Sequence, residues 1–288
     1  MPSNDPTGTY LLRRRAVAAM RGKLAAFKAA VWAYLDPGPT STTKLQLNTP
    51  AAWWGLDTVG KLEAWREWLN SAVAKGFLEA EEGAVDHWYA TFLKEAYTKG
   101  ATMARQDVTP PEVDIFESLF SNDRFISQRF VNGVAVEQVR LVFLRAYDLL
   151  TGITKDMSAK LGAIMADGLA HNQSLTAIAR RISTEIDGIG RKRALVLAQN
   201  EIIYAFNEGL LDSYEEIGVD RLTIDLEFVT AGDERVCPVC RKLAKKRKFW
   251  TVKQARGVIP AHPGCRCRWR AVRAKAAVKR RTILGSNR

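Results

Sequence analysis

The chain has 288 residues, of which 47% are hydrophobic and 26% are charged, a composition typical of folded, water-soluble proteins and not of disordered or fibrous ones. No apolar stretch reaches the roughly 18 residues that a membrane span needs. The N-terminal arginines follow the first apolar residues, an order that does not fit a secretory signal, so we expect a cytosolic protein. The formal charge of +12 is unevenly distributed. Residues 235–288 hold 18 Lys or Arg and no Asp or Glu, whereas the other 234 residues, with 25 basic and 31 acidic side chains, carry a net charge of −6.

The N-terminal part of the chain is expected to form a helical arm. From Tyr10 to Leu35 there is no proline and alanine is abundant, which favours a helix that ends at the Asp-Pro-Gly-Pro run that follows. We therefore expect an arm over residues 1–36 and a linker over residues 37–50, which is rich in Pro, Ser and Thr.

A helical domain is predicted for residues 51–150. Apolar side chains recur there at helical spacing. Two stripes carry this prediction: Leu62, Trp65, Leu69, Ala72 and Val73, and then Val139, Val142, Phe143, Ala146 and Leu150.

The remainder, residues 151–288, begins with helices and ends differently. Ser174 is a candidate N-cap, and we expect a Gly-Ile-Gly turn at residues 188–190 to close the helix that it starts. A long helix is predicted from about Arg193 to Glu216 and ends at Gly218. Apolar and polar residues then alternate over residues 222–230, as in a half-buried strand. The predicted fold is mainly α, with a small α+β module at the C-terminal end.

All four cysteines lie within 31 residues, in an otherwise cysteine-free chain. Cys237 and Cys240 form a C-x2-C pair, which lets one tight turn offer two thiolates to one metal ion. His262, Cys265 and Cys267 follow in a second cluster, HPGCRC. Clustered cysteines in a cytosolic chain favour a metal site over a disulfide scaffold. We therefore predict a zinc-stapled knuckle over about residues 230–270.

Five candidate ligands compete for four positions around zinc. One solution uses Cys237, Cys240, His262 and Cys265, and the other uses the four cysteines with His262 outside. A closed site of four protein ligands is structural, whereas catalysis needs an open position for water. Five candidates favour the closed, structural site.

The basic end is expected to bind phosphate by counterion release, with little sequence preference. Phe249, Trp250 and Trp269 lie among these charges, and we expect them to pack around the knuckle in preference to stacking on bases. The alternative role for the positive charge is docking to an acidic protein surface. The candidate DNA-binding residues are Lys245, Lys246, Arg247, Lys248, Arg266, Arg268, Arg270, Arg273, Lys275, Lys279, Arg280 and Arg281.

Several segments together resemble the phage Mu F-like minor head protein family. They are residues 193–219 (RALVLAQNEIIYAFNEGLLDSYEEIGV), residues 230–240 (TAGDERVCPVC) and residues 259–267 (IPAHPGCRC), and the resemblance covers about residues 150–275. Where the family usually has an Arg-Thr-Glu triplet in the long helix, this chain has Gln199, Asn200 and Glu201.

The resemblance implies a head morphogenesis protein of a tailed phage, present in few copies near the portal vertex of the capsid and assembled in the host cytoplasm. It also implies contact with portal protein, capsid proteins and packaged DNA, and it implies no enzymatic activity. The alternative function is a zinc-containing nuclease, for which Asp233 and Glu234 lie near the cysteines. A nuclease usually holds a divalent ion on carboxylates, and none follows Glu234.

Overall fold

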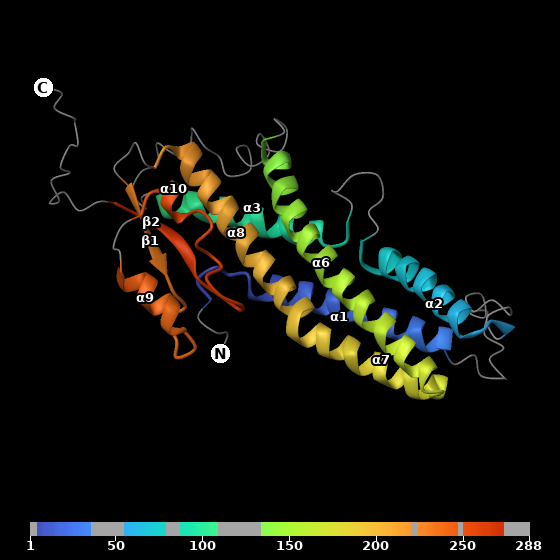
Figure 1. The fold of residues 1–288 in the computed structure, drawn as a ribbon. Coiled ribbons are helices and arrows are strands. Elements are labelled where there is room, and N and C mark those ends of the chain that lie inside the picture. The colour runs from blue at the N-terminus through green and yellow to red at the C-terminus, as the bar shows by residue number, and fades with distance from the viewer. Residues whose placement is uncertain are drawn as a thin grey trace, which may run out of the picture. The chain divides into compact units, whose positions relative to one another are not determined.

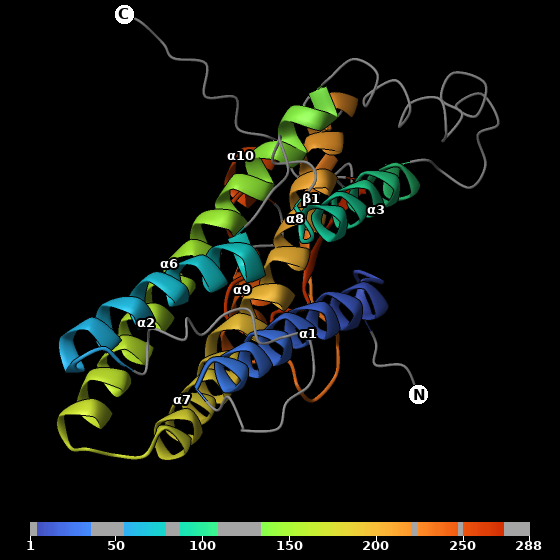
Figure 2. The same cartoon turned by 90° about the vertical axis from the view of Figure 1, so that its right-hand side faces the viewer.

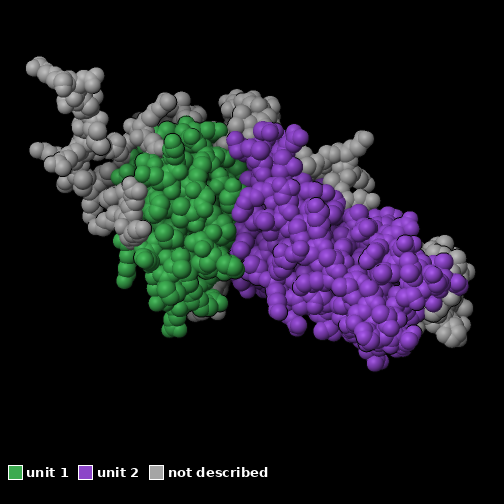
Figure 3. Space-filling view, viewed as in Figure 1, with its two compact units in different colours: residues 1–8, 96–132, 203–288 green, residues 9–95, 133–202 purple. Residues whose placement is uncertain are grey.

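The computed structural model describes residues 5–35, 55–78, 87–108, 134–219, 224–246 and 250–273. The chain forms two compact units, coloured separately in Figure 3. Unit 1 comprises residues 1–8, 96–132 and 203–288, and unit 2 comprises residues 9–95 and 133–202. The predicted linker over residues 37–50 lies outside the described residues. No helix within the described ranges is long and apolar enough to cross a membrane.

Unit 2 is built from helices, seen from two directions in Figure 1 and Figure 2. Helix α6 packs against α2 and α7, and α7 packs against α1. The helices are α1 (Tyr10–Leu35), α2 (Thr58–Val73), the start of α3 (Ala90–Val108), α6 (Val134–Ala170), α7 (Leu175–Ile189) and the start of α8 (Leu195–Ile217). The arm predicted over residues 1–36 therefore contains a helix that packs on this unit.

The helical stripes predicted from the sequence face the core of unit 2. Trp65 and Leu69 of α2 and Val142 and Phe143 of α6 are all buried. The predicted N-cap is also confirmed, because the hydroxyl oxygen of Ser174 accepts a hydrogen bond from the amide of Ala177. Periodicity and capping thus account for most of this unit.

The prediction of a helix-ending turn at residues 188–190 is wrong. Helix α7 runs into a π-helical turn, Gly190–Ala194, and then directly into α8. Gly190 has right-handed helical backbone angles, and a Cβ on it would lie 2.9 Å from Cδ1 of Leu24 in α1. This glycine therefore allows close helix packing and does not end the helix.

The predicted domain boundary at residue 150 lies inside α6, which continues without a break to Ala170. The chain instead passes from one unit to the other within α3 and within α8, near residues 95 and 202. Both helices therefore contribute to both units. Helical periodicity marks where a helix runs but carries no signal for a change of packing partner along it.

Within unit 1, α3 and α8 cross at very short range. A Cβ on Gly100 would lie 1.9 Å from the carbonyl oxygen of Phe206, and one on Gly209 would lie 2.1 Å from the carbonyl oxygen of Tyr97. Real Cβ atoms do not approach backbone that closely, so a larger side chain at either position must displace the facing helix. The predicted end of α8 is confirmed, because Gly218 follows Ile217 with a φ of +75°.

The rest of unit 1 is the small α+β part. Strand β1 (Ile224–Val229) pairs antiparallel with β2 (Arg268–Arg273), and α9 (Pro238–Lys246) packs on β1. A short helix, α10 (Val252–Ala255), lies between α9 and β2 in the sequence. The predicted fold class, mainly α with a small α+β module, is confirmed. The sequence prediction recognised β1 but missed β2.

One face of the sheet supplies the core of the module. Leu226 and Phe228 of β1 lie opposite Ala271 and Trp269 of β2, and all four are buried. The rings of Phe228 and Trp269 meet edge to face with centroids 5.3 Å apart. Trp269 is fully buried, so the expectation that it packs in the module, and does not stack on bases, is confirmed.

Candidate metal centre

The five predicted ligands come from two segments of unit 1. Cys237 immediately precedes α9, and Cys240 lies in its first turn. His262, Cys265 and Cys267 lie in the segment between α10 and β2. Cys240, Cys265 and Cys267 are buried, and Cys237 is partly exposed. Residues far apart in sequence thus converge on α9.

The donor atoms form two overlapping groups that share Cys240. Cys237, Cys240 and His262 have donor atoms within 4.8 Å of one another, as do Cys240, Cys265 and Cys267. The sulfurs of Cys240 and Cys265 are 3.9 Å apart. Zinc–sulfur bonds of about 2.3 Å in a tetrahedron bring ligand sulfurs to a similar separation. A small cavity of about 20 Å³, with Cys237, Cys240, His262 and Cys267 in its lining, has room for a single ion.

His262 is oriented as a metal ligand. Its Nδ1 lies 2.8 Å from the carbonyl oxygen of Pro263, and its Nε2 lies 3.2 Å from Sγ of Cys240. Because a carbonyl oxygen only accepts, Nδ1 carries the proton and the Nε2 lone pair faces the sulfurs. Hydrogen bonds of this kind typically hold metal-binding histidines in place.

The thiol protons are distributed unequally. The hydrogen bond from Cys267 lowers the pKa of Cys265, and burial raises the pKa of Cys240. The pKa of Cys267 is also raised, chiefly because its thiol donates to Cys265. Without a cation the cluster therefore favours one thiolate, and a divalent ion is the group that stabilises several thiolates together. The donor types, their spacing and the cavity fit zinc.

A bidentate ion pair joins the two segments that carry the thiol cluster. Arg266, between the last two cysteines, donates two hydrogen bonds of 2.7 Å to the carboxylate of Asp233. This contact lowers the pKa of Asp233 to about 2. The pair links the segment before α9 to the segment that carries Cys265 and Cys267. Asp233 is therefore ionised, and its carboxylate serves to hold Arg266 in place.

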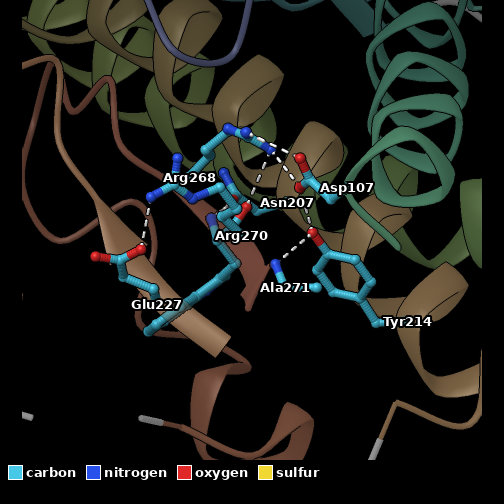
Figure 4. Close-up of polar contacts among 8 residues, drawn as sticks. Asp107, Asn207, Tyr214, Glu227, Arg268, Arg270 and Ala271 are labelled. Atoms are coloured by element: carbon cyan, nitrogen blue, oxygen red, sulfur yellow. Dashed lines mark hydrogen bonds and ion pairs between the residues drawn. The ribbon is translucent and has the colours of Figure 1, made fainter. Parts of the chain in front are cut away.

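A second, more buried network ties β2 to the helices of unit 1 (Figure 4). Arg268 donates to both carboxylate oxygens of Asp107 in α3, at 2.6 Å and 3.2 Å. The hydroxyl of Tyr214 in α8 donates to Asp107 at 2.5 Å and accepts from the amide of Ala271 at 3.0 Å. Burial and the neighbouring Asp107 carboxylate raise the pKa of Tyr214, so this hydroxyl keeps its proton.

Two further contacts position the second ligand segment on α8. The side chain of Asn207 donates to the carbonyl oxygen of Cys267 and accepts from the amide of Trp269. Arg256 donates to three carboxylates that share one face of α8. These carboxylates belong to Glu208, Asp212 and Glu215. These contacts connect the ligand loop to α8.

Three of the predicted DNA-binding arginines have intramolecular partners. Arg266 pairs with Asp233, Arg268 pairs with Asp107, and Arg270 pairs with Glu227 on the facing strand at 2.7 Å. Of the candidate lysines, Lys245 lies exposed on α9. The backbones of Lys246 and Arg273 are described without their side chains. The remaining candidates lie outside the described residues: Arg247, Lys248, Lys275, Lys279, Arg280 and Arg281.

Glu201 of α8 pairs with a cation on another helix of unit 2. Arg145 of α6 donates to the Glu201 carboxylate at 2.5 Å, and the Glu201 side chain is only 2% exposed. Burial raises the pKa of Glu201 to about 7 although Arg145 acts to lower it. Gln199, two residues before Glu201, is uncharged, and the cation that pairs with Glu201 is Arg145 of α6.

Residues 159–270 match the model of a family described as Phage Mu protein F like protein. This range contains all five predicted metal ligands, and it confirms the resemblance expected from the sequence. Neither the curated proteins nor the solved structures include a significant match to this chain.

Proposed function

We propose that this protein is a head morphogenesis protein of a tailed phage, a minor component of the capsid. The observation that carries the proposal is the match of residues 159–270 to the Phage Mu protein F like family. The matched range includes α7, α8, β1, the first half of β2 and the whole thiol cluster. We further propose a place near the portal vertex, where the protein contacts portal protein, capsid proteins and packaged DNA.

We propose that a structural zinc ion holds the module together through Cys237, Cys240, His262 and Cys265. The position of Nε2 of His262, 3.2 Å from the Cys240 sulfur, supports this choice over four cysteines, and Cys267 then acts as a hydrogen-bond donor to the Cys265 sulfur. When bound, zinc supplies a cross-link between α9 and the loop before β2 and stabilises the thiolates.

A structural role accounts for the cluster better than catalysis. Four protein ligands close a tetrahedral site, whereas catalytic zinc keeps one position open for water. Asp233, four residues before Cys237, is held by both terminal guanidinium nitrogens of Arg266 and is not available as a general base. The nuclease alternative lacks a supporting observation among the described residues.

The head function is tested by deleting the coding gene from the phage that carries it. We expect the protein in purified heads of the parent phage, at few copies per particle, and defective or non-infectious particles after deletion. A plasmid copy of the gene should restore infectivity. Infectious particles that never contain the protein would contradict the proposal.

The metal is tested by elemental analysis of purified protein, with one zinc ion expected per chain. Cleavage assays with linear and supercoiled DNA in magnesium or manganese address the enzyme alternative, and we expect no cleavage above background. Cleavage that Asp233→Ala or His262→Ala abolishes would decide for the nuclease.

A further inference from the structure

Three further cations of the module lie on one face of α9. Arg241, Lys242 and Lys245 are all exposed, whereas Cys240 on the same helix is buried against the other thiols. At 100° per residue, Lys245 lies between Arg241 and Lys242 on the helix surface, and Cys240 lies on the opposite side. The three charges therefore form a single outward-facing strip.

These cations differ from Arg266, Arg268 and Arg270 in having no carboxylate partner among the described residues. Among the residues that the structure describes, Lys242 and Lys245 make no ion pair, and Arg241 donates only to the backbone oxygen of Glu234. Arg266, Arg268 and Arg270 are each bound to a carboxylate. Phosphate binding at β2 must compete with an internal partner, whereas the strip on α9 is available.

The residue types on this face suit a nucleic-acid backbone. Interfaces with DNA are rich in cations and poor in apolar side chains, whereas protein interfaces have an apolar core. The only large apolar side chain exposed on α9 is Val239. Arg241 and Lys245 are four residues apart, about 6 Å along the helix axis, which lets both side chains reach neighbouring phosphates of one strand.

The metal cluster determines how this strip is presented. Cys237 precedes α9 and Cys240 lies inside it, so two proposed ligands anchor the helix from its buried side. Arg241 directly follows one of these ligands in the chain. A helix held in this way presents its cations in a constant geometry, which reduces the entropy lost when phosphates bind.

We propose that the outward face of α9, formed by Arg241, Lys242 and Lys245, is the surface by which this protein contacts the phosphates of duplex DNA. The inference rests on the proposed contact with packaged DNA and names the surface that makes it. Arg241 and Lys242 were not among the residues that the sequence pattern indicated. The face binds without base preference, because it offers charge and no base-specific donors.

The test measures binding of the full-length, zinc-loaded protein to a mixed-sequence DNA duplex by fluorescence anisotropy at several salt concentrations. In the variant Arg241→Gln/Lys242→Gln/Lys245→Gln we expect the slope of log affinity against log salt to flatten by about 3, or about 1 for each cation. The control Lys155→Gln/Arg191→Gln/Lys192→Gln removes the same charge from exposed positions of unit 2. This control should retain the parental slope.

The basic residues after β2 are removed in a separate variant that ends at Arg273, because an earlier stop would cut into β2. The α9 substitutions should flatten the slope in this background as well. Unchanged zinc content and circular dichroism show that the variants remain folded.

The outcomes separate this inference from the function on which it depends. If the parent protein does not bind duplex DNA at low salt, the proposed DNA contact itself is wrong. If the parent binds and the α9 variant behaves like the unit 2 control, DNA is bound elsewhere and the α9 inference is overturned. Equal or tighter binding of poly-glutamate, lost in the same variant, assigns the face to an acidic protein and also overturns it.

Discussion

The helical core of unit 2 and the small α+β module of unit 1, which holds the thiol cluster, keep their folds by different means. In unit 2, apolar stripes on long helices bury one another, and the side chains responsible lie at regular spacing. In the module, a two-stranded sheet is too small to be stable alone, so thiols, ion pairs and contacts to α8 complete it. Disruption of a single polar centre should therefore unfold the module and leave unit 2 intact.

The largest difference between the two units is expected when the thiol shared by both donor groups is removed. Cys240→Ser should abolish zinc binding and unfold residues 230–270, because structural zinc contributes on the order of 10 kcal/mol to small domains. Hydrogen exchange read by mass spectrometry should show lost protection there and retained protection in α1, α2 and α6. Ala244→Ser, a matched small substitution in α9, should keep zinc. Equal loss of protection in both units would mean that they fold as one.

A smaller effect is expected where β2 meets the helices of unit 1. Asp107→Ala leaves Arg268, whose side chain is only 11% exposed, without its anion. The loss of one partner from a buried pair costs about 3–5 kcal/mol. Chemical denaturation should show this loss in the free energy of unfolding of unit 1. Glu227→Ala removes the partner of the more exposed Arg270 and should cost less than about 1 kcal/mol.

In unit 2 the corresponding buried polar group is Glu201, and we expect it to make the stability of this unit depend on pH. Its carboxyl has a pKa of about 7 in the folded state, against 4.5 in its ordinary state. The folded state therefore binds the proton more tightly, so this contribution to stability is complete below about pH 4.5 and is lost as the pH rises through 7.

Glu201→Gln should remove that dependence. Relative to the parent, its free energy of unfolding should rise by up to about 3 kcal/mol between pH 5 and pH 8. Thermal or urea denaturation at both pH values measures the difference, and Glu137→Gln, an exposed position on α6, is the control. A constant difference across this range would show that Glu201 is ionised throughout.

The helix crossing in unit 1 provides the smallest of these tests. Gly209→Ala places a methyl group against the backbone of Tyr97, and overpacking of this kind typically costs about 1–3 kcal/mol. Gly152→Ala in α6 has no atom within 4 Å of the new methyl group and should stabilise the helix by up to about 1 kcal/mol. Melting temperatures should shift in opposite directions. A shift of the same sign would contradict the close crossing.

The amino-acid sequence by itself determined the helices of unit 2, the end of α8, the strand β1 and the set of candidate metal ligands. Each depends on residues that are near one another in the chain: apolar side chains three or four apart, a glycine after a helix, or two cysteines three apart. The resemblance to the Mu F-like family came from the same local motifs. The strand β2 was missed because its alternating arginines were interpreted only as charge.

Only the tertiary structure decided what those arginines do and where the units divide. Arg268 meets Asp107 across 161 residues of sequence, and no local pattern indicates such a partner. The glycines at residues 188 and 190 are typical of a turn, yet Gly190 lies inside a helix, where it packs closely against Leu24. The structure thus pairs Arg268 and Arg270 of β2 and leaves Arg241, Lys242 and Lys245 of α9 exposed. Charge can be counted from a sequence, but whether a cation is free depends on which carboxylates the fold places beside it.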